Sequence, residues 1–283
     1  MEIILQAAIG LLAGFLGGLL GVGGSTIIIP GLIIYLQYFG AGYRGQSQHL
    51  LQATAMICNV FIAVSAVVVH HKARAILKPV VLRLVLSALT GIIVGVTVSN
   101  SSPFARENGR YLTMILAGFF LYVTIYNVMR IFSKVDLAVQ FDKTRKIPVW
   151  KIVLVGFPMG FLAGLLGIGG GTLCVPAQQL FLRIPLRNAI ANSAVTIVFS
   201  ALAGSIYKNS TLSLHGFYIM DSLQMAAMII PAAIIGSWLG GKLTHRFSRR
   251  NLRISFIMFM ILVSYMTFRC IPHGYENSGQ GQM

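Results

Sequence analysis

The sequence predicts an all-α integral membrane protein made of two inverted repeats, each a glycine-broken helical hairpin followed by three transmembrane helices. Two observations lead to this prediction. The 283 residues are 56% hydrophobic and 10% charged, and apolar runs of about 20 residues, the length that crosses a bilayer as a helix, recur along the whole chain. In addition, residues 10–30 and 156–176, which lie 146 positions apart, are identical at 12 of 21 aligned positions.

A cluster of glycines interrupts each copy of this repeated stretch: the letters GVGG occupy residues 21–24, and GIGGG occupy residues 167–171. Consecutive glycines break a helix, and an unbroken helix of about 35 residues would reach about 50 Å, too long for one ordinary crossing. We therefore predict that each interrupted segment folds back as a hairpin. Paired interruptions at matching places of two halves are typical of the substrate site of a secondary transporter.

Three uninterrupted apolar spans follow each hairpin. They are predicted at 51–69, 80–98 and 111–129 in the first half, and at 189–207, 219–239 and 254–268 in the second. A polar, charged stretch separates the halves. The prediction divides the chain into an N-terminal membrane repeat at 1–133, a cytoplasmic linker at 134–149, a C-terminal membrane repeat at 150–272 and a disordered tail at 273–283.

Basic residues decide the predicted topology. If each hairpin returns to the side from which it started and the N-terminus lies outside, 17 of the 22 Lys and Arg fall on the cytoplasmic side and five outside. Treating each interrupted segment as one straight crossing separates these charges less well. The favoured topology makes the chain a multi-pass protein of the inner (plasma) membrane, places both termini outside and inverts the second half relative to the first.

The net charge of +16 follows from these basic loops and does not indicate a nucleic-acid partner. The three cysteines lack metal-binding or redox spacing, and the chain contains no Walker motif, HExxH motif or Ser/His/Asp arrangement. We therefore expect no enzyme activity, no catalytic residue, no cofactor and no metal. None of the six Asp and Glu lies in the middle of a predicted span, which favours an anionic substrate. Membrane lipid is the other expected partner, and the oligomeric state stays undetermined.

The candidate substrate site lies where a helix restarts after each glycine cluster. A helix that begins inside the membrane presents unpaired N–H groups and a partial positive charge, which suit an anion. The two helix starts supply Gly23, Gly24, Ser25 and Thr26 in one half and Gly169, Gly170, Gly171 and Thr172 in the other. The alternative role for glycine in membrane helices is close packing, which we favour for the G-x-x-x-G patterns elsewhere but not for these clusters.

Polar residues in the span after each hairpin are further candidates for substrate binding. Aligning the repeats places Thr54 opposite Asn192, which is followed by Ser193, and these three side chains could donate hydrogen bonds to the anion. Hydrogen bonding between helices explains such residues equally well. Weaker candidates are His49, Asn59 and Gln179, and an interfacial histidine is more often simply solvated.

At these residues the chain resembles the TauE/SafE sulfite exporter family, also called the toluene sulfonate uptake permeases. The resemblance rests on GLLGVGGSTIIIP and GLLGIGGGTLCVP, each followed by a short loop and then by QATA or IANSAV, and it extends over both halves. It implies a multi-pass permease for sulfur-containing anions, whose pathway the glycine clusters line. One departure is Ser25, where the second copy has Gly171, so the two half-sites differ in sequence.

Two functions therefore stay open at the level of the sequence. The favoured one is a secondary transporter that moves a small sulfur-containing oxyanion, such as sulfite, thiosulfate or an organosulfonate, by alternating access. The alternative is a non-transporting membrane scaffold or partner subunit in which the glycines serve only to pack helices.

Overall fold

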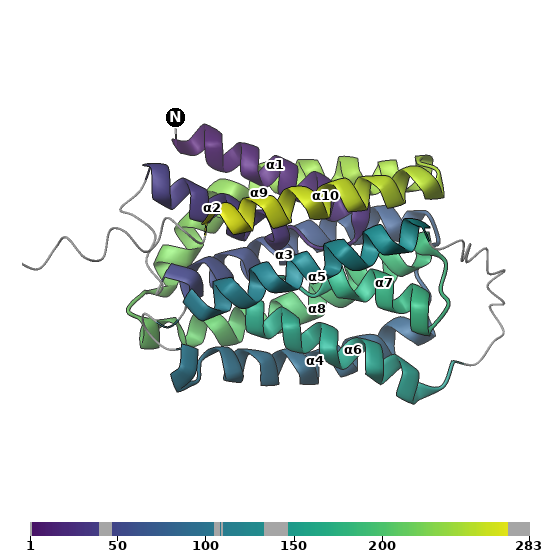
Figure 1. Ribbon diagram of the computed structural model, residues 1–283, viewed down its shortest axis with the longest axis horizontal. Helices are drawn as coiled ribbons and strands as arrows, with labels where there is room; N and C mark the ends of the chain where they lie inside the picture. Colours follow the sequence, from purple (N-terminus) through teal and green to yellow (C-terminus); the bar gives the residue numbers. More distant parts are fainter. Residues whose placement is uncertain (1, 40–46, 105–107, 109, 133–146, 271–283) are drawn as a thin grey trace, which may run out of the picture.

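The computed structural model describes residues 2–39, 47–104, 108, 110–132 and 147–270, and helices are the only regular elements in these ranges (Figure 1). The first half contains α1 (Glu2–Leu20), α2 (Ser25–Phe39), α3 (Ser47–Lys72), α4 (Lys78–Ser99), the short 3-10 helix η1 (Ser102–Phe104) and α5 (Arg110–Phe132). The second contains α6 (Val149–Leu166), α7 (Gly171–Phe181), α8 (Leu186–Ser210), the 3-10 helix η3 (Leu212–His215), α9 (Ile219–Arg246) and α10 (Arg249–Cys270). The predicted tail and nearly all of the predicted linker lie outside the described residues.

The predicted all-helical membrane fold is confirmed. Six described helices are long and apolar enough to cross a membrane, namely α1, α3, α4, α6, α8 and α9. The predicted spans 111–129 and 254–268 fall within α5 and α10. Both predicted hairpins are broken at the glycine clusters, and the returning helices α2 and α7 are short, with 15 and 11 residues. A helix of 11 residues is only about 17 Å long, so α7 cannot cross a bilayer alone.

Close packing between small residues joins the two halves. A Cβ added at Gly14 of α1 would collide with the carbonyl oxygen of Ala233 on α9, and a Cβ added at Gly160 of α6 would collide with that of Ala88 on α4. In both pairs the first helix of one half packs against the fourth helix of the other. The packing interpretation of these G-x-x-x-G glycines is thus confirmed, because only a residue without a Cβ lets the backbones come so close.

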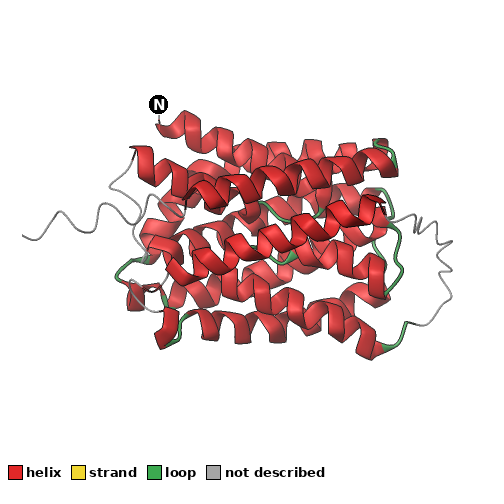
Figure 2. Ribbon diagram, viewed as in Figure 1, coloured by secondary structure: helices red, strands yellow, loops and turns green. Residues whose placement is uncertain are grey.

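The two broken hairpins enter the bundle from opposite ends. In Figure 1, α1 begins at the end marked N, whereas α6 begins at the other end and runs back toward the first. Helices α3 and α8 pack against each other between the two outer pairs. Figure 2 shows loop segments inside the bundle, away from both ends, and residues 21–24 and 167–170 are all buried. The glycine breaks therefore lie in the interior of the protein.

Basic side chains gather at the end opposite the N-terminus. Hydrogen bonds tie the loops together there: Asn188 Nδ2 donates to the carbonyl oxygen of Ala75 (2.8 Å), and Arg187 Nη2 donates to that of Phe247 (2.8 Å). The segments that meet at this end carry Lys72, Arg74, Lys78, Arg183, Arg187, Lys242 and Arg246. All seven belong to the set that the predicted topology assigns to the cytoplasm, so their clustering at one end agrees with that topology.

Candidate functional site

The two glycine breaks touch each other. A Cβ added at Gly171 would lie 2.5 Å from both the carbonyl oxygen of Gly21 and the Cα of Val22, and one added at Gly169 would collide with Nδ2 of Asn59 on α3. Both breaks also contain glycines with positive φ, including Gly23 at 80° and Gly169 at 70°, a backbone conformation that other residues rarely adopt. Glycine is thus required here for two reasons, the turn and the close contact.

Each break also packs against the third helix of the other half. Gly21 lies against Ile190 of α8, and Gly167 lies against Gln52 of α3. The repeat alignment that places Thr54 opposite Asn192 also places Gln52 opposite Ile190, so these two contacts are equivalent. The structure therefore brings the predicted helix starts together at a centre that both halves build.

Asn59 caps the start of α2, whereas no side chain of the described residues caps the start of α7. Asn59 Oδ1 accepts hydrogen bonds from the backbone N–H of Gly24 (2.7 Å) and of Ser25 (3.0 Å), while Asn59 Nδ2 donates to Ser25 Oγ (2.7 Å). The N-cap residue of α7 is Gly170, which has no side chain with which to cap the helix. A carbonyl oxygen of the protein thus occupies the position that an anion would take on α2, and the two half-sites are chemically unequal.

Asn192 and Ser193 bond within the protein. Ser193 Oγ donates to the carbonyl oxygen of Gly21 (2.7 Å), which fixes the first break to α8. Asn192 Nδ2 donates to Oε1 of Gln178 on α7 (3.1 Å), and Asn192 Oδ1 accepts from the backbone N–H of Leu77 (2.9 Å). Ser193 thus holds the backbone of the first break, and Asn192 joins α8 to α7 and to the loop before α4, as the interhelical alternative supposes.

Gln178 of α7 joins this network as well, although the sequence analysis does not select it. Its predicted neighbour Gln179 is half-buried. One signal could have identified Gln178. It follows Gly171 by seven residues and Cys174 by four, and therefore lies on the same face of α7 as these buried residues.

Three of the predicted site residues carry hydroxyls without a partner. Thr26, Thr54 and Thr172 are fully buried, and their Oγ1 atoms form no hydrogen bond with any residue that the structure describes. Thr26 and Thr172 occupy equivalent positions, the second residue of α2 and of α7. By contrast Thr196, equally buried, donates to the carbonyl oxygen of Asn192 (2.9 Å). Because an unpaired buried hydroxyl costs about 1–3 kcal/mol, three of them in a predicted site indicate unused capacity to bind a ligand.

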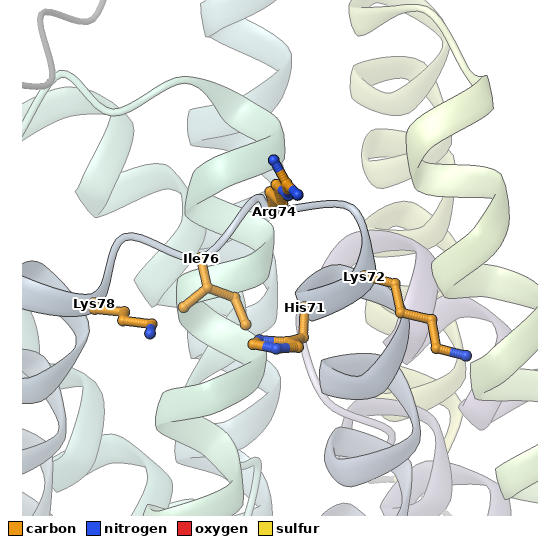
Figure 3. A pocket seen from close by; sticks show the side chains of 5 residues that line it. All are labelled: His71, Lys72, Arg74, Ile76 and Lys78. Carbon is orange, nitrogen blue, oxygen red and sulfur yellow. The ribbon is translucent and has the colours of Figure 1, made fainter.

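A basic hollow lies at the charged end of the bundle (Figure 3). It encloses about 420 Å³ and is lined by His71, Lys72, Arg74, Ile76 and Lys78, which belong to the end of α3, the following loop and the start of α4. The loop beside this hollow is the one that Asn192 holds through Leu77. Asn192 therefore connects the loop beside the hollow to α7, because it also bonds to Gln178. Within the described ranges, no group of three His, Cys, Asp or Glu gathers that could hold a metal ion.

The structure corrects the placement of two residues near the opposite end. The sequence counted Lys208 among the charges of an outside loop and placed His49 at a solvated mouth, yet both side chains are fully buried. Lys208 Nζ lies 2.8 Å from His49 Nδ1, and it donates to Ser99 Oγ (2.9 Å) and to Asn100 Oδ1 (2.8 Å). The sequence signal was slight: Lys208 directly follows the predicted span 189–207, and α8 continues for one further turn.

We expect protein stability to fall as the pH drops below about 6.5. Burial, and then the charge of Lys208, lower the pKa of His215 from 6.5 to about 4. The unfolded state therefore binds a proton that the folded state excludes. Each pH unit between these values lowers the free energy of unfolding by up to about 1.4 kcal/mol, whereas His215 has no effect above this range. Thermal unfolding in detergent between pH 7.5 and 4.5 measures the slope. His215→Gln should make it shallower, and an unchanged slope would contradict this assignment.

Comparison with known proteins adds independent information. Residues 6–267 match the family described as Sulfite exporter TauE/SafE. The probable membrane transporter protein YunE of Bacillus subtilis is 25% identical over 270 residues, which cover 93% of this chain and 94% of YunE. The probable membrane transporter protein MJ0441 of Methanocaldococcus jannaschii is 27% identical, with 87% and 88% covered. The probable membrane transporter protein MamO of Magnetospirillum gryphiswaldense is 26% identical over 86% of this chain but only 41% of MamO. No solved structure matches the chain.

Proposed function

The chain belongs to the sulfite exporter TauE/SafE family, and on that premise we propose that it is a secondary transporter that moves a small sulfur-containing oxyanion across the membrane by alternating access. Sulfite, thiosulfate and organosulfonates are the substrates considered. One observation supports this proposal most: two broken helices meet inside the bundle, and each carries a buried, unpartnered threonine hydroxyl at its second residue. A scaffold that needs glycines only for packing has no use for these hydroxyls.

In this proposal the oxyanion binds at the start of α7. No side chain of the described residues caps that helix end, and its partial positive charge attracts an anion. Gly169, Gly170 and Gly171 let the backbone approach the ligand closely, and Thr172 supplies a hydroxyl donor. Thr26 and Thr54 are the further donors. Gly23, Gly24, Ser25, Asn59, Asn192 and Ser193 shape the site through the contacts described above.

The two halves are proposed to be inverted repeats that move against each other. Two observations support this proposal. Helices α1 and α6 begin at opposite ends of the bundle, and each packs against a helix of the other half, α1 against α9 and α6 against α4. The breaks are buried from both sides, so one half must shift before a substrate enters. In the proposed topology the protein lies in the inner membrane, its basic end faces the cytoplasm and both termini lie outside. The basic hollow is then the cytoplasmic entrance to the pathway, and its positive charge attracts anions.

Flux measurements test this function. Purified protein in liposomes is given labelled sulfite, thiosulfate or methanesulfonate, and protein-free liposomes serve as the control. We expect saturable uptake of at least one of the three anions. Movement of none of them, with protein that is monodisperse and unfolds cooperatively, would contradict the proposal and favour the non-transporting scaffold.

A further inference from the structure

Lys208 is a buried cation whose hydrogen-bond partners are all neutral. It lies in the last turn of α8, and its three bonds go to His49, Ser99 and Asn100, which lie on or next to α3 and α4. No Asp or Glu within the described ranges accepts a bond from it. Asp221, at the start of α9, instead accepts from the backbone N–H of Tyr218 (2.8 Å). A buried ammonium without a counter-charge is costly, and in membrane proteins such a group marks an ion pathway or a proton relay.

Lys208, His49 and His215 lie together, and the hydrogen bonds of the two histidines indicate that this cluster holds one exchangeable proton. His49 Nε2 lies 2.9 Å from the carbonyl oxygen of Phe104 and must therefore carry a hydrogen, so Nδ1 presents its lone pair to Lys208 Nζ. His215 stacks on His49 with ring centroids 3.5 Å apart, and its Nε2 lies 3.2 Å from Asn100 Oδ1. Because burial lowers the pKa of His215 to about 4, that ring stays neutral near pH 7. The proton in question is thus shared between two basic nitrogens, Lys208 Nζ and His49 Nδ1.

A short chain of hydrogen bonds connects this proton to the second glycine break. Ser99 Oγ accepts from Lys208 and donates to Gln52 Oε1 (3.2 Å). Gln52 Nε2 donates to the carbonyl oxygen of Leu165 at the end of α6 (3.1 Å), and the Gln52 side chain packs against Gly167. The whole chain is buried, with Gln52, Ser99 and Lys208 all inaccessible to solvent.

Loss of the proton from Lys208 would change these bonds. A neutral amine has two hydrogens and one lone pair for its three neighbours, so one neighbour must become a donor. Ser99 is the neighbour that can do so: its hydroxyl turns from Gln52 Oε1 toward Lys208 Nζ. Gln52 then loses one of the two bonds that hold it against the break. The charge of Lys208 is thereby connected to the end of α6 and to the second glycine break that follows it.

We propose that Lys208, together with His49, is the proton-binding site that couples proton movement to anion transport. One proton binds at Lys208 Nζ when the oxyanion is bound and leaves as the oxyanion leaves, so that the two ions move together. The anion supplies the negative charge that the cluster lacks, and the two bindings therefore favour each other. This inference rests on the proposed function, because it needs an anion that moves.

The experiment measures anion and proton movement in the same proteoliposomes. The vesicles contain a pH-sensitive dye, and valinomycin with equal potassium on both sides holds the membrane potential at zero. Thiosulfate and methanesulfonate are used because neither binds a proton near neutral pH, so a proton that moves must be carried by the protein. For the wild type we expect the lumen to acidify as the anion enters, and an acid-outside gradient to raise accumulation several-fold.

Two variants test the assigned residues. Lys208→Arg keeps a positive charge that does not titrate, and Ser99→Ala removes the connection to Gln52 while leaving Lys208 in place. Both should retain exchange of labelled for unlabelled anion at equal pH, and both should lose accumulation driven by the pH gradient. The matched control is Lys242→Gln: Lys242 is exposed, lies over the ring of Trp238 (3.3 Å to its centroid) and should not affect coupling.

The outcomes separate this inference from the proposed function. If the wild type exchanges neither of these two anions and also takes up no sulfite, the transport proposal fails. If it exchanges anions but moves no proton with them, the coupling inference is overturned without any variant. If the wild type is coupled and folded Lys208→Arg is coupled to the same degree, Lys208 is not the coupling site. If folded Ser99→Ala is coupled to the same degree, the connection through Ser99 and Gln52 does not carry the coupling. Size-exclusion profiles and retained exchange show that each variant is folded.

Discussion

Thr172→Val is expected to reduce oxyanion flux at least tenfold while making the protein more stable. Valine has nearly the shape of threonine but lacks the hydroxyl, which in the structure is buried and unpartnered. Removing an unpaired buried polar atom should stabilise the substrate-free protein by about 1–3 kcal/mol. The same change deletes a donor to an anion in a site of low dielectric constant, and a hydrogen bond to a charged group contributes about 1.5–3 kcal/mol, equivalent to about ten- to a hundredfold in binding. Flux in proteoliposomes and melting in detergent measure the two effects.

Thr196→Val is the matched control. Its hydroxyl is equally buried but donates to the carbonyl oxygen of Asn192. This variant should lose about 1 kcal/mol of stability and keep its flux. Thr26→Val, at the equivalent place in the other half, should behave like Thr172→Val. A Thr172→Val protein that is stabilised and transports normally would remove this hydroxyl from the substrate site.

Gly170→Ala is expected to destabilise the protein by about 2–5 kcal/mol. The φ of Gly170 is 73°, a conformation that costs an L-residue about 1–2 kcal/mol of stability. The new Cβ would also lie 2.6 Å from the carbonyl oxygen of Met159, and this overpacking adds about 1–3 kcal/mol. The backbone at that contact belongs to α6 and cannot give way as a flexible side chain would. Thermal unfolding, together with the yield of monodisperse protein, measures the loss.

Two other glycines separate these contributions. Gly216 has a φ of 82° but open space around its Cβ position, so Gly216→Ala should show the conformational cost alone, about 1–2 kcal/mol. Gly118 in α5 has neither constraint, and Gly118→Ala should be neutral or stabilising by about 0.5–1 kcal/mol. If Gly170→Ala were as stable as Gly118→Ala, the close contact between α6 and the second break would be refuted.

Much of the fold follows from local properties of the chain. Consecutive glycines end a helix whatever surrounds them, and the helices of the structure are interrupted at the clusters 21–24 and 167–171. The six plain spans are long apolar runs, and each lies within one helix for the same reason. The candidate site was only partly predictable. Thr26, Asn59 and Ser193 look alike as polar residues in apolar spans, yet Asn59 and Ser193 have partners inside the protein whereas the hydroxyl of Thr26 has none.

The helical membrane fold, the two breaks and the family are predictable from the sequence, because they depend on composition, on the length of apolar runs and on a repeat that can be read along one chain. Which buried polar groups have hydrogen-bond partners depends instead on how the helices pack. Gln52 and Leu165 lie 113 positions apart, and His49 and Lys208 lie 159 positions apart. Such bonds depend on how each helix is rotated and which helices meet, and no local pattern specifies either. For that reason the unpaired threonines and the buried lysine emerge only from the packed bundle.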